Sequence, residues 1–541
     1  MKRVLVVAGS DSSGGAGLEA DQKVCAAHGC YAMTATAALT AQNTQGVYGI
    51  HETPSNFVQK QIDACIEDIG VDVLKTEGML ASAQTVSVVA NAIRKHNVRI
   101  SVVDPVMVAT SGAQLLPEKA IKVLVEELLP VATIVTPNIP EANLMLRKAG
   151  KKPVEIHDLD GVKELAAEIH KLGPRYVLLK GGHVPLTPSY GVARSEEEKK
   201  IVANVLFGGE SVDVIEFPYQ KTANTHGTGC SLASALACNL ALGLDLVQSV
   251  IAASRYVDAG IRTAVKLGLG SGPINHFHSL QVQPFPPGGF IDYLLDRYDV
   301  QPAWYEYTHH EFVERMGDGT LAPEAFQYYM IQDYLYLTHF ARANALAGYK
   351  AKHIDDIAGA ASIVLHIHRE MELHLKECSE FGLTQGMMDR YEESQACTAY
   401  SRYVLDIGQS EDWLALQIAL LPCLLGYGMI ARRLKALQKT NPPKTPNRYA
   451  TWINNYVASD YTEAVKKGCA LVEKHAFKQS PSRIEDLVKI FVHATKMESG
   501  FWNMAHAPER RSTSTKTIST VSRNGNTSRN DHNEGEVARA S

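Results

Sequence analysis

The sequence predicts two domains of different class, a doubly wound α/β domain followed by an all-α helical bundle. Short β-branched runs bounded by glycine lie almost entirely before residue 290. All four tryptophans and sixteen of the 22 tyrosines lie beyond that residue, where long amphipathic patterns replace the short runs. With 541 residues the chain also exceeds what a single hydrophobic core organises, so two or more domains are expected.

The composition is that of a soluble globular protein, with 45% hydrophobic and 21% charged residues. A net charge of −5 gives no reason to expect nucleic acid or a membrane surface as a partner. The nine cysteines are scattered without a Cys-x-x-Cys pair, which argues against a disulfide framework or structural zinc and for a reducing, cytoplasmic compartment. The longest apolar run, 414–431, falls short of the roughly 20 residues of a membrane span and predicts a buried helix.

The first half begins with a buried strand at 4–8, a glycine-rich loop at 9–17 and a helical pattern at 18–28. This order is the usual opening of a doubly wound α/β domain. Further strands are expected at 32–38, 71–76, 100–103, 133–136 and 176–180, with helices between them such as 56–69, 83–96 and 120–128. Alternation at this spacing favours a parallel sheet with right-handed crossovers.

Polar residues follow the predicted strands at the edge of the sheet where ligands collect in open α/β folds. They are Asp21, Gln42, Asp104, Asn138, Glu141 and Lys180, with Met79 after the third strand. Any one of them alone could be a loop residue or a helix cap. Carboxylates, amides and a lysine together are the parts of a phosphoryl-transfer site, although the chain has no Walker-type Gly-x-x-x-x-Gly-Lys-Ser/Thr motif.

The stretch Asn224-Thr-His-Gly-Thr-Gly-Cys230 predicts a tight turn that runs into a helix. The backbone N–H groups of such a turn point at one spot, where the helix dipole also favours negative charge, so the turn suits a phosphate. Cys230 lies in the first turn of that helix, where we expect the pKa of a thiol to be lowered. The alternative interpretation is a glycine-rich loop before an alanine-rich core helix, with no chemical role.

Seven motifs of the first half occur in an order and spacing that resemble a known family. They are Ala8-Gly-Ser-Asp-Ser-Ser-Gly-Gly-Ala-Gly17, Ala41-Gln-Asn-Thr44, Asp104-Pro-Val-Met107, Thr136-Pro-Asn-Ile-Pro-Glu141, Lys180-Gly-Gly-His183, the turn ending at Cys230, and Gly272-Pro-Ile-Asn-His276. Over about residues 2–278 the chain resembles the hydroxymethylpyrimidine/phosphomethylpyrimidine kinases of thiamine synthesis, which are ribokinase-like. The resemblance implies that this domain uses MgATP to convert 4-amino-5-hydroxymethyl-2-methylpyrimidine (HMP) to its phosphate and then its diphosphate.

The resemblance also implies roles for individual residues. The positions that hold the pyrimidine are matched by Asp21, Gln42 and Met79. The nucleotide–magnesium region is matched by Asp104, Asn138 and Glu141, of which Asp104 and Glu141 would hold Mg²⁺, and a phosphate contact is matched by Lys180. The anion hole is matched by Gly227, Thr228 and Gly229, with Cys230 as the base that deprotonates the hydroxyl.

One departure from the family concerns the segment Lys75-Thr-Glu-Gly78. It has two residues between the lysine and Gly-Met, where the family usually has one. The extra residue would either push Met79 out of register or place Glu77 near the pyrimidine. Either change is expected to weaken substrate binding.

Beyond a proline- and glycine-rich stretch at 281–289, which predicts a linker, the sequence turns to helical patterns without strands. Helices are expected at 291–298, 306–317, 323–350, 355–381, 396–407, 412–438, 450–455, 459–474 and 482–503. The predicted organisation is therefore a kinase-like domain at 1–278, a linker at 279–299, a helical domain at 300–505 and a polar tail at 506–541 that should be disordered.

Two residue pairs on the predicted helices share a helix face, Cys423 with Tyr427 and Glu498 with Phe501. A cysteine or aromatic residue at such spacing is more often an inert core residue. The motifs Tyr329-Met-Ile-Gln-Asp-Tyr-Leu-Tyr-Leu-Thr-His339, Leu420-Leu-Pro-Cys423 and Glu498-Ser-Gly-Phe-Trp502, however, resemble the thiaminase II (TenA) family over about residues 300–505. That resemblance implies a haem-oxygenase-like helical fold.

The TenA resemblance implies that Cys423 is a nucleophile that adds to the pyrimidine ring, that Glu498 is an acid/base, and that Asp333 anchors the aminopyrimidine edge. An aromatic slot that stacks the ring would be formed by Tyr336, Tyr400, Tyr427, Tyr456 and Phe501. An electron-poor ring suits aromatic faces, a carboxylate and a thiolate with a proton donor nearby. The implied reaction is hydrolytic release of HMP from thiamine or its degraded aminopyrimidine products, without metal or organic cofactor.

The first reading of the whole chain is a fused thiamine salvage enzyme, an arrangement similar to one known in fungi. Its partners would be pyrimidines, thiamine and ATP, and it is expected to form a homo-oligomer. A second reading keeps the kinase and makes the helical half a module that only binds or oligomerises. A third makes the kinase also act on pyridoxine-like alcohols.

Overall fold

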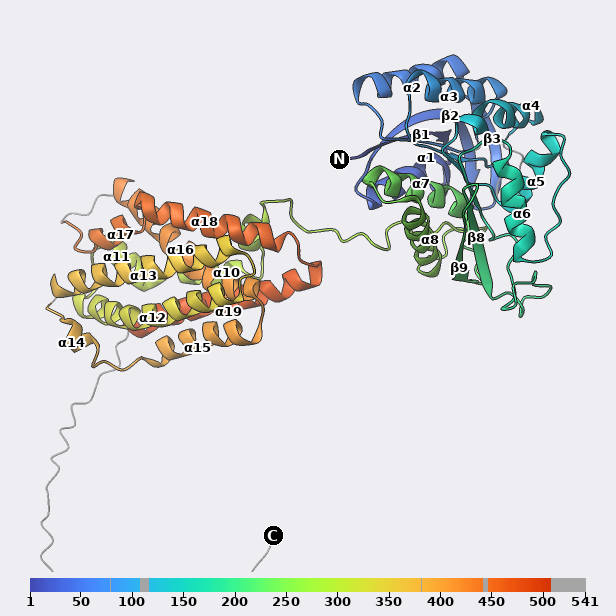
Figure 1. Ribbon diagram of the computed structural model, residues 1–541. Coiled ribbons are helices and arrows are strands. Elements are labelled where there is room, and N and C mark those ends of the chain that lie inside the picture. The colour runs from blue at the N-terminus through green and yellow to red at the C-terminus, as the bar shows by residue number, and fades with distance from the viewer. Residues whose placement is uncertain (78, 108–115, 381, 441–445, 507–541) are drawn as a thin grey trace, which may run out of the picture. The chain divides into compact units, whose positions relative to one another are not determined.

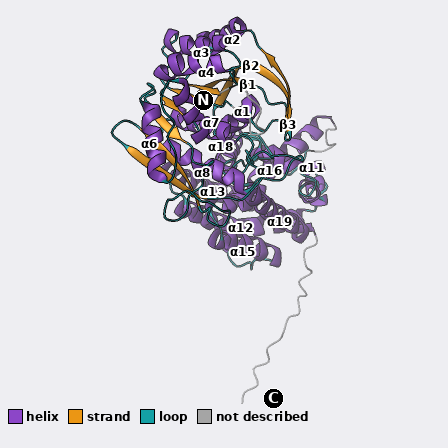
Figure 2. Ribbon diagram, turned by 90° about the vertical axis from the view of Figure 1, so that its right-hand side faces the viewer, coloured by secondary structure: helices purple, strands orange, loops and turns teal. Residues whose placement is uncertain are grey.

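The computed structural model describes residues 1–77, 79–107, 116–380, 382–440 and 446–506. The chain forms two compact units, and the boundary between them along the sequence lies between Leu280 and Gln281. Figure 1 shows the first unit as a sheet covered by helices, in blue to green, and the second as a set of helices alone, in yellow to red. Strands, drawn in orange in Figure 2, belong to the first unit among the described residues. The predicted order of fold classes is confirmed.

The first unit is built on a nine-stranded sheet within the described ranges, with strand order β3-β2-β1-β4-β5-β6-β7-β8-β9. The strands are β1 (Arg3–Gly9), β2 (Tyr31–Asn43), β3 (Gly46–Glu52), β4 (Val73–Glu77), β5 (Ser101–Asp104), β6 (Ile134–Val135), β7 (Tyr176–Leu179), β8 (Ile201–Phe207) and β9 (Val212–Pro218). Strands β2, β1, β4, β5, β6 and β7 pair in parallel, as predicted.

The two edges of the sheet differ from the prediction, because β3, β8 and β9 pair antiparallel to their neighbours. Strand β3 exposes Tyr48 and Ile50, so it lacks the buried pattern of the central strands. Residues 201–218 form a hairpin that buries fewer side chains on one strand, β9, than on the other. Half-exposed edge strands give a weak sequence signal, which explains why they were not predicted.

Helices cover both faces of this sheet. They are α1 (Gly17–Ala27), α2 (Ser55–Asp68), α3 (Ala83–Lys95), α4 (Glu118–Val123), α5 (Ile139–Lys148), α6 (Leu159–His170), α7 (Thr228–Leu242) and α8 (Leu246–Arg262). Alternate residues of β1 serve the two layers: Leu5 and Val7 join one core, whereas Val4 and Val6 join the core beneath α7 and α8. A strand buried on both faces reads as a continuous apolar run, as residues 4–8 do.

The second unit consists of α9 (Phe290–Asp296), α10 (Gln301–Thr308), α11 (Glu311–Asp318), α12 (Pro323–Lys350), α13 (Ile354–Glu380), α14 (Gln385–Met388), α15 (Gln395–Ser410), α16 (Trp413–Thr440), α17 (Ala450–Asn455), α18 (Ser459–Ala476) and α19 (Pro481–His506). The helix predicted at 306–317 is instead two helices. The break follows from a cap, because Nδ1 of His310 accepts the backbone N–H of Phe312 and so begins α11 anew.

The segment predicted as a linker, 279–299, contains helix α9. Phe290 and Leu294 are fully buried in the core of the helical unit, and Phe285 packs against the same core. The carboxylate of Glu473 accepts the N–H groups of Phe290 and Ile291 and caps α9 from outside. The tail prediction falls outside the described residues from 507 onward, whereas His506 ends α19.

Helix α16 is the one described helix whose length and composition would allow it to cross a membrane, which by itself is weak evidence. In the helical unit, 78% of its most apolar window is buried against neighbouring helices. The helix also continues through Pro422. The buried helix predicted for 414–431 is therefore confirmed, and it is the element that carries Cys423.

Candidate active sites

A cavity of about 840 Å³ lies at the carboxyl edge of the parallel strands in the first unit. Its lining includes Gln42, Met79, Asn138, Glu141, Lys180 and the four residues Gly227 to Cys230, all predicted from the sequence. Asp21 and Asp104 do not line it, since both are fully buried beneath its floor. The fold therefore gathers most of the predicted residues around one space and places two carboxylates behind it.

The turn before α7 is shaped by Gly227, whose φ of +76° is left-handed. A Cβ at Gly227 would lie 1.9 Å from the carbonyl oxygen of Gly15, so the two glycine loops interlock and only glycine fits. Helix α7 begins at Thr228, and the N–H groups of its first turn have no acceptor within the helix. These donors border the cavity, as an anion-binding turn at this position would require.

Lys180 supplies the positive charge beside this turn. Its Nζ donates to Oδ1 of Asp104 at 2.6 Å, and the hydroxyl of Thr136 donates to the same oxygen at 2.8 Å. Burial would lower the pKa of Lys180, but the carboxylates of Asp104 and Glu141 outweigh it and raise the pKa. Lys180 therefore stays charged next to the place where a phosphate would bind.

Asn138 and Glu141 have a structural task as well as a place in the cavity. Asn138 accepts the N–H of Glu141, and Oε2 of Glu141 accepts the N–H of Asn138, which forms a capping box at the start of α5. Burial raises the pKa of Glu141 to about 7. Part of the Asn-Ile-Pro-Glu signal in the sequence thus comes from helix capping.

A buried layer beneath the cavity contains Asp21, Lys75, Glu77 and Cys230. Nζ of Lys75 lies 2.8 Å from Asp21 and 3.6 Å from Glu77, and the hydroxyl of Ser234 donates to Asp21 at 2.6 Å. Each carboxyl oxygen of Asp21 thus accepts a hydrogen bond from a side chain of the protein. Its predicted contact with the pyrimidine is not visible in this arrangement, because Asp21 has no exposed surface.

The expectation that the pKa of Cys230 is lowered is wrong. Burial raises the pKa of this thiol well above its ordinary value, and the carboxylate of Glu77 raises it further. Sγ of Cys230 donates a hydrogen bond to Oε1 of Glu77. The helix N-terminus and Lys75 favour a thiolate, but they do not outweigh burial next to a carboxylate.

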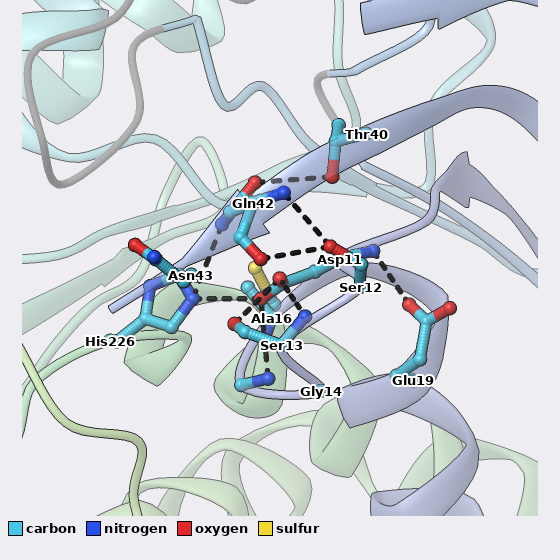
Figure 3. Close-up of polar contacts among 12 residues, drawn as sticks. Asp11, Ser12, Ser13, Gly14, Ala16, Glu19, Thr40, Gln42, Asn43 and His226 are labelled. Carbon is cyan, nitrogen blue, oxygen red and sulfur yellow. Dashed lines mark hydrogen bonds and ion pairs between the residues drawn. The ribbon is translucent and has the colours of Figure 1, made fainter. Parts of the chain in front are cut away.

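Asp11 and His226 form a pair that the sequence reasoning missed. Oδ2 of Asp11 lies 2.8 Å from Nε2 of His226, and the same oxygen accepts the N–H groups of Gly15 and Ala16 (Figure 3). The amide nitrogen of Gln42 lies 3.4 Å from the same ring nitrogen. The pair therefore joins the first glycine loop to the turn at 224–230, here called the phosphate turn, and to Gln42, the predicted pyrimidine contact. The Asp-Ser-Ser-Gly-Gly run, typical of an Asp-centred turn, was the signal available.

Burial would raise the pKa of Asp11, but hydrogen bonds from His226 and Ser13 outweigh it and lower the pKa to about 2. Asp11 is therefore a carboxylate at neutral pH. Figure 3 shows it at the centre of its loop, with Ser13 and Ala16 on one side and His226 on the other. The carboxylate of Asp11 thus stabilises the conformation of the first glycine loop through hydrogen bonds from Ser13, Gly15 and Ala16.

In the helical unit the predicted residues come together around Glu498 of α19. Its carboxyl oxygens accept hydrogen bonds from the hydroxyls of Tyr400, at 2.8 Å, and Tyr427, at 3.4 Å. Burial raises the pKa of Glu498 to about 8, so the group is mostly protonated at neutral pH. Cys423 is half-buried on α16, and burial, with Glu498 and Asp333 nearby, raises the pKa of its thiol well above the ordinary value.

The aromatic residues predicted to form a slot lie close together. Tyr336 stacks on Tyr400 with ring centroids 4.8 Å apart and meets Phe501 edge-on at 5.6 Å, and Tyr427 lies 5.1 Å from Tyr456. The hydroxyl of Tyr329 lies 3.5 Å from Asp333. Sequence reasoning missed Glu370 of α13, which accepts a hydrogen bond from Tyr456 at 3.3 Å and contributes to the raised pKa of Cys423.

Comparison with known proteins matches both units. Residues 11–275 match the family model described as phosphomethylpyrimidine kinase, and residues 297–507 match that of the TENA/THI-4/PQQC family. Putative hydroxymethylpyrimidine/phosphomethylpyrimidine kinase 2 of Schizosaccharomyces pombe is 44% identical over 499 residues, which cover 92% of this chain and 90% of that protein.

Two further similarities are of the same kind. Hydroxymethylpyrimidine/phosphomethylpyrimidine kinase THI20 of Saccharomyces cerevisiae is 34% identical over 543 residues, which cover 93% of this chain and 95% of that protein. A solved phosphomethylpyrimidine kinase from Clostridium difficile is 36% identical, covering 48% of this chain and 98% of that one, with a TM-score of 0.40. The two relatives from yeasts extend over both units of this chain.

Proposed function

The chain belongs to the family of hydroxymethylpyrimidine/phosphomethylpyrimidine kinases that carry a second, TENA/THI-4-type domain, and we propose that its two units act on the same pyrimidine. The first unit is a kinase of thiamine biosynthesis. The second releases HMP by hydrolysis from thiamine or from its degraded aminopyrimidine products. Together the two activities recover the pyrimidine and return it to its phosphorylated forms.

The observation that carries the kinase assignment is one cavity bordered by the phosphate turn, Lys180 and Glu141. The N–H groups of Gly229 and Cys230, in the first turn of α7, and the charged Nζ of Lys180 would bind the phosphates of ATP. The pyrimidine would lie toward Gln42 and Met79, with its hydroxymethyl group near Sγ of Cys230. In this arrangement Cys230 takes the hydroxyl proton as the oxygen attacks the γ-phosphorus.

Magnesium fits this cavity at Glu141. Carboxylate oxygens are the ligands that Mg²⁺ prefers, and Glu141 lines the cavity. Asp104 was predicted to share this role, but Lys180 and Thr136 occupy its Oδ1 and it lies behind the lining. Its Oδ2 has no hydrogen-bond partner among the described residues, so Glu141 is the ligand that we assign and the part of Asp104 stays a prediction. When bound, Mg²⁺ would neutralise charge on the phosphates during transfer.

The hydrolase assignment is supported by Cys423, Glu498 and the aromatic slot. The slot suits a flat aminopyrimidine, and Asp333 would anchor its amino edge. Sγ of Cys423 would bond to the ring as the thiol proton passes to a ring nitrogen, and Glu498, protonated at neutral pH, would donate its proton to the departing group. Water then adds its oxygen to the carbon that lost that group and returns a proton to Glu498. The S–C bond breaks, and the proton on the ring nitrogen returns to Sγ.

Mass-spectrometric product analysis of the full chain with thiamine and MgATP tests both assignments. HMP diphosphate is the expected end product, and a parallel reaction started from HMP isolates the kinase. Cys423→Ser should still make HMP diphosphate when it is given HMP. It should make none when the starting compound is thiamine or 4-amino-5-aminomethyl-2-methylpyrimidine. Equal HMP release by wild type and Cys423→Ser would rule out the hydrolase, and failure to phosphorylate HMP would rule out the kinase. Pyridoxal is tested as an alternative substrate of the kinase, because its phosphorylation would show that the kinase also acts on pyridoxine-like alcohols.

A further inference from the structure

Glu77 ends strand β4 and is buried, with 5% of its surface exposed. All five residues of this strand are buried, so the carboxyl group lies in the interior of the unit. A buried carboxylate is costly unless it is paired or hydrogen-bonded. The neighbours of Glu77 therefore indicate what the residue does.

The contacts of Glu77 point at Cys230. Oε1 accepts the hydrogen bond from Sγ of Cys230, which lies 153 positions further along the chain. Oε2 lies 3.6 Å from Nζ of Lys75 and has no hydrogen-bond partner among the described residues. Glu77 does not line the cavity, whereas Cys230 does. The thiol thus stands between the cavity and the carboxylate.

Charged groups from several elements face this pair. Lys75 lies on β4 itself, Asp21 comes from α1, and Asp104 on β5 is in register with Glu77. Lys180, at the end of β7, is bonded to Asp104. The carboxylates of Asp21, Glu77 and Asp104 thus outnumber the ammonium groups of Lys75 and Lys180 around this pair. Adding a thiolate would worsen the surplus of negative charge, so Cys230 holds its proton.

We propose that Glu77 is a positioning residue for phosphoryl transfer, one that orients the Cys230 S–H away from the cavity and accepts its proton during the reaction. The proposal rests on the function proposed above, in which Cys230 takes the proton of the substrate hydroxyl. With its hydrogen directed at Glu77, Sγ presents a lone pair to the cavity. The arrangement is a relay of the kind in which a third group orients the base.

The step balances as a displacement with two proton transfers. The O–H bond of the hydroxymethyl group breaks as its oxygen bonds to the γ-phosphorus of ATP, and the bond from that phosphorus to ADP breaks. The hydroxyl proton passes to Sγ while the former S–H proton passes to Oε1 of Glu77. After product release the protons return along the same path to solvent, and no oxidant or reductant is needed.

Glu77→Gln tests the proposal, because an amide keeps an acceptor oxygen but cannot take a proton. The expected result with HMP and MgATP is a fall in kcat of about 100-fold, the range of general acid–base effects, with KM for HMP little changed. The pH dependence of kcat should also change, which loss of packing alone would not produce. Glu77→Asp keeps a carboxylate and is expected to regain at least part of the lost kcat.

The matched control is the same substitution in a Cys230→Ser background. If Glu77 acts through the thiol, Glu77→Gln should have little further effect there. Wild-type kcat in Glu77→Gln, or an equal loss in both backgrounds, would overturn the proposal. If Glu77→Gln fails to fold, as judged by thermal unfolding, Glu77→Met decides. It fills a similar volume without a carboxylate, so an unchanged pH profile and kcat in that variant would also overturn the proposal. A wild type that does not phosphorylate HMP would instead refute the proposed function itself.

Discussion

Each unit of the chain places a cysteine next to a glutamate, but the surroundings of the two pairs differ. Cys230 and Glu77 lie in a layer that also contains Lys75 and Lys180. Glu498, near Cys423, is instead held by the hydroxyls of Tyr400 and Tyr427. Lysines suit the anionic phosphates of a kinase substrate, whereas tyrosines suit a flat, neutral or cationic pyrimidine. The two sites therefore contain the same kind of reactive side chain and differ in the residues that surround it.

The two units also differ in the protonation of one carboxyl group each. Glu498 has hydroxyl donors but no ion-pair partner among the described residues, and burial raises its pKa to about 8. Asp11, in the kinase unit, is bonded to His226 and to backbone N–H groups, and its pKa is lowered to about 2. One unit thus keeps a buried acid protonated, and the other keeps one ionised.

The largest expected effect comes from removing the nucleophile of the helical unit. Cys423→Ser should lower HMP release by about 10⁴-fold or more, because a covalent step loses its attacking atom. Phosphorylation of HMP should be unchanged, since Cys423 belongs to the core of the other unit. The measurement is the rate of each reaction in the same preparation. If both rates fell together, the two sites would not be independent as the comparison requires.

A smaller loss is expected from Gly227→Ala, which places a Cβ 1.9 Å from the carbonyl oxygen of Gly15. The interlocked loops must separate, so kinase activity should fall by about 10²-fold or more, as misplaced groups do. Gly243→Ala is the matched control. It lies at the other end of α7 with φ of +94° and nothing within 4 Å of its Cβ, so only the left-handed strain of about 1–2 kcal/mol is expected. Equal activity in the two variants would show that the interlock is not needed.

The protonated state of Glu498 predicts how stability depends on pH. Its pKa is about 8 when folded and 4.5 ordinarily, so the folded protein binds this proton more tightly than the unfolded chain. That stability is fully present below about pH 4.5 and is lost as pH rises through about 8. Denaturant unfolding of wild type and Glu498→Gln should therefore show wild type losing stability relative to the variant between about pH 4.5 and 8. Parallel curves would indicate that Glu498 is ionised in the folded protein.

The smallest effect is expected from Asp11→Asn, which removes a charge but keeps the shape of the side chain. Losing charge-assisted hydrogen bonds should cost about 2 kcal/mol of unfolding free energy at neutral pH. Because the folded pKa is lowered to about 2 from 3.8, this stability is present above about pH 3.8 and is lost as pH falls through about 2. The gap between wild type and variant should narrow on acidification. A constant gap would mean that the charge of Asp11 contributes little.

The central fold was predictable because its signals are local. Residues 4–8 read as a strand buried on both faces, and the bounds predicted for α12 are those found. The edge strands β3 and β9 were not predicted, since each leaves side chains exposed. The break between α10 and α11 depends on one histidine cap, which periodicity does not reveal.

The sequence was enough to predict which residues belong to the two sites. It was not enough to predict the protonation state of Cys230 or the contacts between residues that are far apart in the chain. Sequence motifs marked Glu498 and Cys423, and the structure brings them together with the predicted aromatic residues. The raised pKa of Cys230 was missed because it depends on burial of the thiol and on Glu77, which is remote in sequence. The same distance hid the pairing of Asp11 with His226. Contacts of this kind follow from the topology of the sheet and have no local pattern.

The interlock of the two glycine loops has a consequence for the synthesis of the chain. Asp11 and His226 are 215 positions apart, which at about 5–20 residues per second corresponds to roughly 10–40 s between their appearance at the ribosome. Until α7 is made, the core that Val4 and Val6 share with it stays uncovered. The phosphate turn should therefore form late in folding, and the nascent first half should be the part most dependent on chaperones.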